Sequence, residues 1–290
     1  MTDLSEFTPN TPLMLVGCGN MGQALVRGWL TAGLNPAALV IVDPAANADD
    51  LPEFVGAVFL SGAAQMPAGV SARLLLLAVK PQVMNDVLAA MSPTVGVHTV
   101  VVSVAAGVTL AQMRRGLSGL SGGSAGGAGG GLLVRAMPNT PAAVGAGVTG
   151  LAADAGVGEA DKALTDAVMK AAGKTVWLAG EELMDAVTAT SGSGPAYVFH
   201  MVEALTVAAV KAGLPEAEAE VLARQTIVGA ARLLDVNNDV SAGTLRERVT
   251  SPGGTTAAAL EVLMNTEDGL TDLMTRAVAA AKKRGAELAD

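Results

Sequence analysis

Gly17-Cys18-Gly19-Asn20-Met21-Gly22 stands between a short apolar run, Leu13–Val16, and a helical pattern that covers Met21–Ala32. This is the GxGxxG pattern in the context that gives it meaning, a strand followed by a helix. The first glycine allows the tight turn, the second lets the backbone approach a pyrophosphate, and the third lets the helix pack on the strand. The free N–H groups at the helix start attract phosphate. The stretch therefore predicts a dinucleotide site contacted by Gly17, Gly19, Asn20, Met21 and Gly22.

Short apolar runs and helical patterns alternate over residues 1–180. Near-continuous apolar runs are typical of strands that helices cover on both faces, and their alternation with helices indicates a parallel sheet. The expected strands are Leu13–Val16, Leu39–Val42, Ala57–Leu60, Leu74–Val79, Thr99–Val104 and Leu132–Ala136, and the expected helices are Met21–Ala32, Pro81–Met91 and Leu110–Arg115. The fold class is thus α/β, with a Rossmann-like and mostly parallel sheet.

The pattern changes at about Glu181, beyond which Ala, Leu and Glu at helical spacing dominate. Helices are expected over Pro195–Gly213, Pro215–Val236, Thr255–Met264 and Leu270–Ala289, with Gly213 and Gly285 as helix stops or weak points. The sequence therefore predicts two domains, a dinucleotide-binding domain over 1–180 and an all-α domain over 181–290. Small helical domains rich in Ala and Leu often bury their apolar faces against another subunit.

Composition excludes several classes of protein. The net charge is −9, and no run of Lys or Arg is long enough to follow a phosphate backbone, which argues against nucleic-acid binding. The apolar runs are strand-sized, well below the roughly 18 residues of a membrane span. The acidic N-terminus lacks the features of a signal peptide, so a cytoplasmic location is expected. With one Cys and two His, we expect no metal site.

Asp43 ends the second strand, 21 residues beyond Gly22. An acid at this place accepts hydrogen bonds from the adenosine ribose diol. It also disfavours a 2′-phosphate, and the Pro44-Ala45-Ala46-Asn47 segment that follows supplies no cation to hold one. The sequence therefore favours NADH over NADPH. The alternative is that Asp43 only caps a turn before Pro44.

Two later strand ends carry further candidate cofactor contacts, because ligands lie outside the carboxyl ends of strands in such sheets. The first is the segment Ala78-Val79-Lys80-Pro81, in which Lys80 either reaches the cofactor or is a solvated loop residue. The second is Asn139, which with Thr140 lies between two prolines in Met137-Pro138-Asn139-Thr140-Pro141. A purely structural turn is the alternative there. The low-complexity stretch Gly119–Gly131, with eight glycines in thirteen residues, is interpreted as a solvent-exposed linker.

Two segments of the helical half contain too many glycines for plain helix. They are Thr190-Ser191-Gly192-Ser193-Gly194-Pro195-Ala196-Tyr197 and Thr250-Ser251-Pro252-Gly253-Gly254-Thr255-Thr256. Either segment can be only a helix cap. In the second, however, backbone N–H groups converge at a helix start and make a nest for an anion such as a carboxylate. Two such costly caps in one small domain favour a function.

Taken together, these motifs resemble those of the pyrroline-5-carboxylate reductases, the last enzymes of proline synthesis, over essentially the whole chain. The matching stretches are GCGNMG, AVKPQ, VSVAAGV, RAMPNTPAAVGAG, DAVTATSGSGPAYVF and VTSPGGTTAAALEVL. The resemblance implies hydride transfer from NAD(P)H to the C=N carbon of a cyclic imine, without a metal or a covalent nucleophile. It also implies a helical domain that interleaves with a partner in a homodimer, and dimers that can assemble into rings.

The resemblance further assigns the substrate site. It implies that the substrate carboxylate rests on the backbone N–H groups of Gly254, Thr255 and Thr256, and that the Thr256 hydroxyl is the catalytic group that hydrogen-bonds the ring nitrogen. One departure from the family is Asp43, since many members use NADPH and carry Ser, Thr or Arg near that position, so NADH and NADPH both stay open.

Two other functions are weighed against this one. A β-hydroxyacid dehydrogenase has a similar plan, but its catalytic lysine is replaced by Val198, counting from Gly194. A nucleotide-sensing module without catalysis is the second, and the complete SPGGTT segment argues against such decay.

Overall fold

The structure is a computed structural model that describes residues 4–67, 69–118 and 131–289. The chain divides into two compact units, which we call the sheet unit (Met1–Gly192 with Lys282–Asp290) and the helical unit (Ser193–Ala281). The predicted linker Gly119–Gly131 lies, apart from its last residue, outside the described residues.

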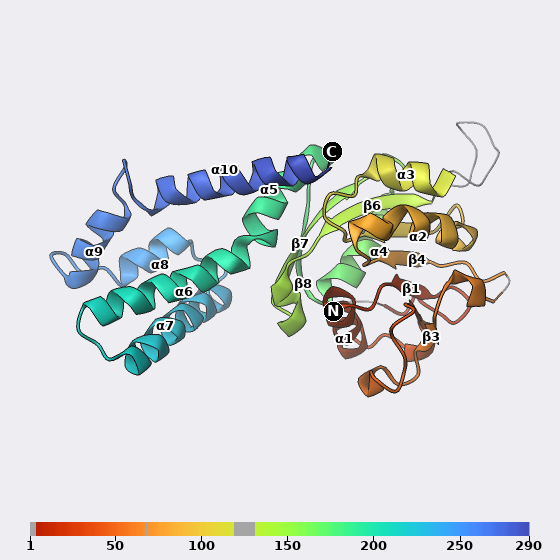
Figure 1. The fold of residues 1–290 in the computed structure, drawn as a ribbon, viewed down its shortest axis with the longest axis horizontal. Helices are drawn as coiled ribbons and strands as arrows, with labels where there is room; N and C mark the ends of the chain where they lie inside the picture. The colour runs from red at the N-terminus through yellow and green to blue at the C-terminus, as the bar shows by residue number, and fades with distance from the viewer. Residues whose placement is uncertain (1–3, 68, 119–130, 290) are drawn as a thin grey trace. The chain divides into compact units, whose positions relative to one another are not determined.

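The sheet unit is built on one eight-stranded sheet with the order β3-β2-β1-β4-β5-β6-β7-β8. All neighbours pair in parallel except β6 and β7, so the predicted α/β class with a mostly parallel sheet is confirmed. Figure 1 shows the helices packed around this sheet. The strands are β1 (Leu13–Val16), β2 (Leu39–Val42), β3 (Val58–Leu60), β4 (Leu74–Leu77), β5 (Val100–Ser103), β6 (Leu132–Met137), β7 (Gly147–Ala153) and β8 (Gly173–Trp177).

Two apolar cores cover the two faces of the sheet, because successive side chains of a strand point to opposite faces. Leu13 and Leu15 of β1 pack in one core with the helices α1 (Asn20–Thr31) and α4 (Glu159–Lys170). Met14 and Val16 pack in the other with α2 (Met84–Met91) and α3 (Leu110–Ser118). Burial on both faces explains why the central strands are continuous apolar runs.

Three of the strands and α-helices up to the end of β8 were not predicted. The strand β7 has the sequence GVTGLAA, whose small residues give no apolar run, and β8 alternates exposed and half-buried residues. The helix α4 lies between them. Two glycines of this region are required by close packing: a Cβ on Gly147 would lie 2.8 Å from the Ala172 oxygen, and one on Gly150 would lie 2.6 Å from a Val187 methyl. Tertiary packing therefore selected residues that are poor strand formers.

The helices that follow β8 largely match the prediction. They are α5 (Met184–Val187), α6 (Gly194–Lys211), α7 (Glu216–Val236), α8 (Ala242–Arg248), α9 (Thr255–Leu263) and α10 (Leu270–Ala289), of which α5 and α8 were not predicted. Gly213 follows α6 with a φ of +107°, the left-handed conformation that ends many helices. Gly285 does not end α10, so of the two predicted roles only that of a weak point within the helix is left for it. Within the part of the chain that the structure describes, no helix combines the length and apolar character that a membrane crossing requires.

Candidate functional site

The glycine-rich loop between β1 and α1 has the geometry that a pyrophosphate requires. Gly17 has a φ of +93°, and a Cβ there would lie 2.7 Å from the Ala78 oxygen. A Cβ on Gly22 would lie 2.3 Å from the Gly17 oxygen, so neither glycine has room for a side chain. Gly19 caps α1 and faces open space, and no side chain caps that helix. The first N–H groups of α1 are therefore available to an anion.

The Asp43 carboxylate lies against this loop. Its Oδ2 accepts a hydrogen bond from the Cys18 N–H at 2.6 Å, and its Oδ1 accepts one from the Ala45 N–H at 2.8 Å. The bond from Cys18 connects the end of β2 to the glycine-rich loop. The bond from Ala45 caps the turn at Pro44, which is the alternative role considered for Asp43 from the sequence. One carboxylate thus performs the local role and also lies where a ribose is expected.

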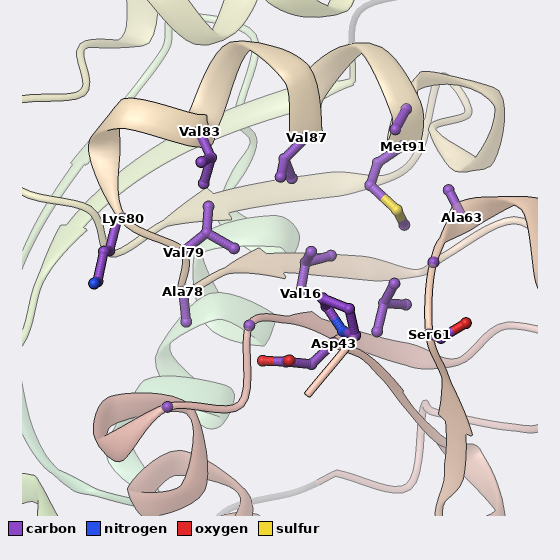
Figure 2. Close-up of a pocket in the computed structure, with 16 residues that line it drawn as sticks. Val16, Asp43, Ser61, Ala63, Ala78, Val79, Lys80, Val83, Val87 and Met91 are labelled. Carbon is purple, nitrogen blue, oxygen red and sulfur yellow. The ribbon is translucent and has the colours of Figure 1, made fainter. Parts of the chain in front are cut away.

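A cavity of about 630 Å³ opens beside these groups, at the carboxyl ends of β1, β2 and β4. In Figure 2, Val83, Val87 and Met91 point into it from one side, and Asp43 lies across from them. Such a volume with mostly apolar walls and few polar groups is typical of a small-molecule site. The lining residues are Val16, Gly17, Gly19, Val42, Asp43, Pro44, Ser61, Gly62, Ala63, Ala78, Val79, Lys80, Val83, Val87, Ala90 and Met91.

Several predicted cofactor residues meet in this cavity, and others do not. Gly17, Gly19, Asp43, Ala78, Val79 and Lys80 line it. Pro81 follows them as the first residue of a short 3-10 turn, and Gly22 is buried in α1. Asn20 and Met21 line a smaller cavity of about 320 Å³ together with Thr140 and Ala143. In Figure 2, Lys80 and Ser61 lie at opposite ends of the larger cavity.

Both polar atoms of the Asn139 side chain form hydrogen bonds within the protein. Its Nδ2 donates to the Ser191 carbonyl at 3.1 Å, and its Oδ1 accepts from the Val148 N–H at 2.9 Å. The residue is only 9% exposed. A cofactor contact by this amide would have to use its second N–H or the second lone pair of its Oδ1.

The thiol of Cys18 is buried in the glycine-rich loop. Burial, together with the nearby Asp43 carboxylate, raises the pKa of this thiol to about 11. The thiolate is therefore scarce at neutral pH, as expected for a space-filling residue rather than a nucleophile.

The predicted substrate residues begin α9 in the helical unit. Gly254 precedes the helix without a side-chain cap, so the N–H groups of the first turn have no partner within it. Gly253 has a φ of +69°, and the Gly254 N–H bonds the Ser251 carbonyl at 3.0 Å. Thr256 is half-buried and Thr255 is exposed. This is the nest-like turn that the sequence predicted.

Part of the cavity wall was missed from the sequence. Ser61, Gly62 and Ala63 directly follow β3, and the rule used for Asp43 and Lys80 would have found them. Val83, Val87 and Met91 share one helical face, at the spacing that marks such a face. The sequence predicted a helix over Pro81–Met91, but not that one of its faces lines a cavity.

Comparisons with known proteins cover both units. Residues 181–288 match the model of the pyrroline-5-carboxylate reductase dimerisation family, and residues 12–107 match a family of coenzyme F420-dependent NADP oxidoreductases. A pyrroline-5-carboxylate reductase of Pseudomonas aeruginosa is 37% identical over 284 residues, 97% of this chain and 98% of that protein. The chain belongs to the pyrroline-5-carboxylate reductase family. The reductase of Haemophilus influenzae is 36% identical over 250 residues, 86% of this chain and 88% of that one.

Solved reductases of the family share the fold. The structure from Coxiella burnetii has a TM-score of 0.84 at 35% identity and covers 97% of this chain and 99% of its own. The Plasmodium falciparum enzyme, solved with NADP bound, has a TM-score of 0.74 at 26% identity and covers 98% of this chain and 100% of its own. As a member of this family, the chain is an NAD(P)H-dependent oxidoreductase with a dimerisation domain.

Proposed function

We propose that the chain reduces pyrroline-5-carboxylate to L-proline, the last step of proline biosynthesis. The observation that carries this function is the similarity to pyrroline-5-carboxylate reductases over nearly the full length of both proteins. It extends through both units, so the nucleotide loop and the SPGGTT turn occur together in one chain.

The reaction requires a hydride at the C=N carbon of the imine and a proton on its nitrogen. Bound NAD(P)H supplies the hydride. We assign to the Thr256 hydroxyl the hydrogen bond to the ring nitrogen, since a hydroxyl can both donate and accept. The substrate carboxylate is proposed to rest at the start of α9, on the N–H groups of Thr255 and Thr256 and beside Gly254, whose own N–H bonds the Ser251 carbonyl. The helix dipole also favours a negative charge there.

The dinucleotide is proposed to lie across the carboxyl ends of the strands, with its adenosine half beside Asp43 and its pyrophosphate on Gly17–Gly22. The remaining contacts are assigned to Ala78, Val79, Lys80 and Pro81, whereas the Asn139 amide bonds Ser191 and Val148 of the protein itself. The switch in strand order between β1 and β4 supports this placement, because dinucleotides bind at such points.

NADH is proposed as the preferred cofactor. The Asp43 carboxylate, held by two N–H groups at the cavity wall, would repel a 2′-phosphate. Among the described residues that line the cavity, Lys80 is the only cation, and it lies at the far end from Ser61. The Plasmodium falciparum enzyme binds NADP, so the preference is proposed for this chain alone.

We further propose that the chain works as a homodimer or a ring of dimers. The helical unit supports this, because its only buried hydrophobic residues are Ala219 and Ala223. A unit of this size cannot be stable with so small a core unless another surface covers it.

An assay of NADH and NADPH oxidation with pyrroline-5-carboxylate tests the function. Turnover is expected with both cofactors, with the higher kcat/KM for NADH. Tight nucleotide binding without any turnover would contradict the reductase and favour a nucleotide sensor.

A further inference from the structure

Asn139 connects three segments of the sheet unit through one side chain. It follows β6, its Oδ1 accepts from the Val148 N–H of β7, and its Nδ2 donates to the Ser191 carbonyl 52 residues away. Ser191 belongs to a single π-helical turn, Thr188–Gly192, which we call the π turn. Such turns are rare, and they occur frequently at functional sites.

The Ser191 carbonyl needs a donor because the sequence removes the usual one. In an α-helix this carbonyl would accept from the N–H four residues on, which is Pro195 and has none. The N–H five residues on, that of Ala196, donates to the Ser193 carbonyl instead, at 3.1 Å. The Asn139 side chain therefore supplies the hydrogen bond that the main chain after Ser191 does not make.

Packing holds the π turn against the same strands. A Cβ on Gly192 would lie 2.8 Å from the Met137 methyl group, so the turn closely approaches the end of β6. Thr188 and Ser191 also donate their hydroxyls to the carbonyls of Met184 and Val187. A strained backbone conformation persists only where its surroundings hold it in place. The contacts of Gly192 with Met137 and of Asn139 with Ser191 do so for the π turn.

The turn after β6 also borders the dinucleotide loop. Thr140 lines the cavity of about 320 Å³ that Asn20 and Met21 of α1 share with it. Since Asp43 marks the adenosine side, the nicotinamide half is expected over the carboxyl ends of β4, β5 and β6. Asn139 thus lies between the π turn and the place where hydride transfer is expected.

We propose that Asn139 is a positioning residue that holds the π turn against the end of β6 and so shapes the nicotinamide end of the site. The proposal rests on the proposed reductase function for its kinetic test only. Its action is indirect, through the Ser191 carbonyl. A misplacement of about 1 Å is enough to slow a reaction about a hundredfold.

Asn139→Asp is the most informative variant, because it keeps the oxygen that accepts from Val148 but has no N–H for Ser191. We expect kcat to fall about tenfold or more, while the KM for the nucleotide changes less than about twofold. Hydrogen exchange of the amides in the π turn should become faster. Asn237→Ala is the matched control, since it also removes an amide bond to a helix carbonyl, that of Leu233, at an exposed site. It should leave kcat unchanged.

A second variant distinguishes a positioning role of Asn139 from a role in stability alone, in which Asn139 would only provide a donor for the Ser191 carbonyl. Adding Pro195→Ala to Asn139→Asp restores a main-chain N–H for the Ser191 carbonyl. The double variant is expected to regain part of the melting temperature lost in Asn139→Asp but none of the lost kcat. Recovery of both would overturn the proposal, because the amide would then have served stability alone.

Other outcomes are equally decisive. A wild-type kcat in Asn139→Asp, or unchanged exchange in the π turn, would contradict the positioning role. A raised KM for the nucleotide at constant kcat would make Asn139 a direct cofactor contact instead. If the wild-type protein lacked turnover, the reductase function would fail, while hydrogen exchange would still test the contact between Asn139 and the π turn.

Discussion

At the scale of single residues, Asp43 shows how position along the chain determines a role. Asp43 directly follows β2, and its carboxylate accepts a hydrogen bond from the Cys18 N–H, which joins the acid to the glycine-rich loop. Asp43 and the glycine-rich loop therefore cannot be changed independently. With the cofactor placed as proposed, this fixed charge would disfavour the extra phosphate of NADPH.

Replacement of this carboxylate is expected to change the cofactor preference. Asp43→Ser removes the negative charge and leaves a hydroxyl that can donate to a 2′-phosphate. The ratio of kcat/KM for NADPH to that for NADH should rise about tenfold, equivalent to about 1.4 kcal/mol. Asp49→Ser is the control, because it removes the same charge from an exposed part of the same loop. An equal rise in the control would show that only net charge matters.

Thr256 is the residue to which the proposed hydrogen bond with the ring nitrogen is assigned. Thr256→Ala is expected to lower kcat/KM about tenfold or more without loss of the fold, because it deletes an oriented hydrogen bond to the reacting nitrogen. Thr256→Ser keeps the hydroxyl and should retain most of the rate. Steady-state kinetics with circular dichroism of each variant measures both. An unchanged rate in the alanine variant would remove Thr256 from the mechanism.

How far the sequence predicts the site depends on how local each contact is. The glycine-rich loop and Asp43 follow local rules, since a strand, a tight turn and a helix start require particular residues at fixed spacing. The bond from Asn139 to Ser191 joins positions 52 residues apart, and only the fold reveals it. The same holds for Val87 and Met91, whose helical spacing is equally typical of a core.

At the scale of secondary structure, one carboxylate of α4 bonds two side chains of the edge strand β8, which also pairs with β7. Asp166 of α4 accepts hydrogen bonds from Thr175 and Trp177 of β8 at 2.7 and 3.1 Å, and from Lys170 at 2.7 Å. Burial would raise the pKa of Asp166, but these hydrogen bonds and the Lys170 charge outweigh it and lower the pKa. The ionised carboxylate is therefore the form that the fold prefers.

A lowered pKa in the folded state makes stability depend on pH in a known direction. The contribution of Asp166 is present above its unfolded pKa, roughly 4, and is lost as the pH falls through the folded value. Asp166→Asn should destabilise the chain by about 1–3 kcal/mol at pH 7, as for hydrogen bonds to a charged group. The difference from wild type should shrink below about pH 4. Urea unfolding at both pH values measures it, and a difference independent of pH would exclude the charge as the cause.

The errors at this scale have a common physical origin. Prediction of β1, β2, β4 and β5 succeeds because both faces of these strands are buried, which demands continuous apolar residues. β7 and β8 lie toward one end of the sheet, where close packing requires glycine at Gly147 and Gly150 and where β8 has one exposed face. Their sequences therefore respond to neighbours distant in sequence, and local patterns do not reveal them.

At the scale of the whole molecule, the two units differ in how they bury apolar surface. The sheet unit contains both apolar cores, whereas the helical unit has only Ala219 and Ala223 as buried hydrophobic residues. Many large apolar side chains of α6 and α7 are exposed instead, among them Phe199, Val221 and Val228. A surface of this kind marks an interface, and the match of residues 181–288 to a dimerisation family agrees with that.

A charge placed on this surface tests the proposed assembly. Val228 lies in the middle of α7 and is 55% exposed, while Val55 of the sheet unit is 79% exposed and serves as the matched control. Val228→Glu should lower the molar mass in light scattering from two or more chains toward one chain, because an unpaired charge is costly in an apolar interface. Val55→Glu should leave the mass unchanged.

Dissociation should also lower the thermal stability of the helical unit, since its apolar faces then return to water. An unchanged mass for Val228→Glu would exclude the centre of α7 from the interface, whereas a wild-type mass of one chain would exclude the dimer itself.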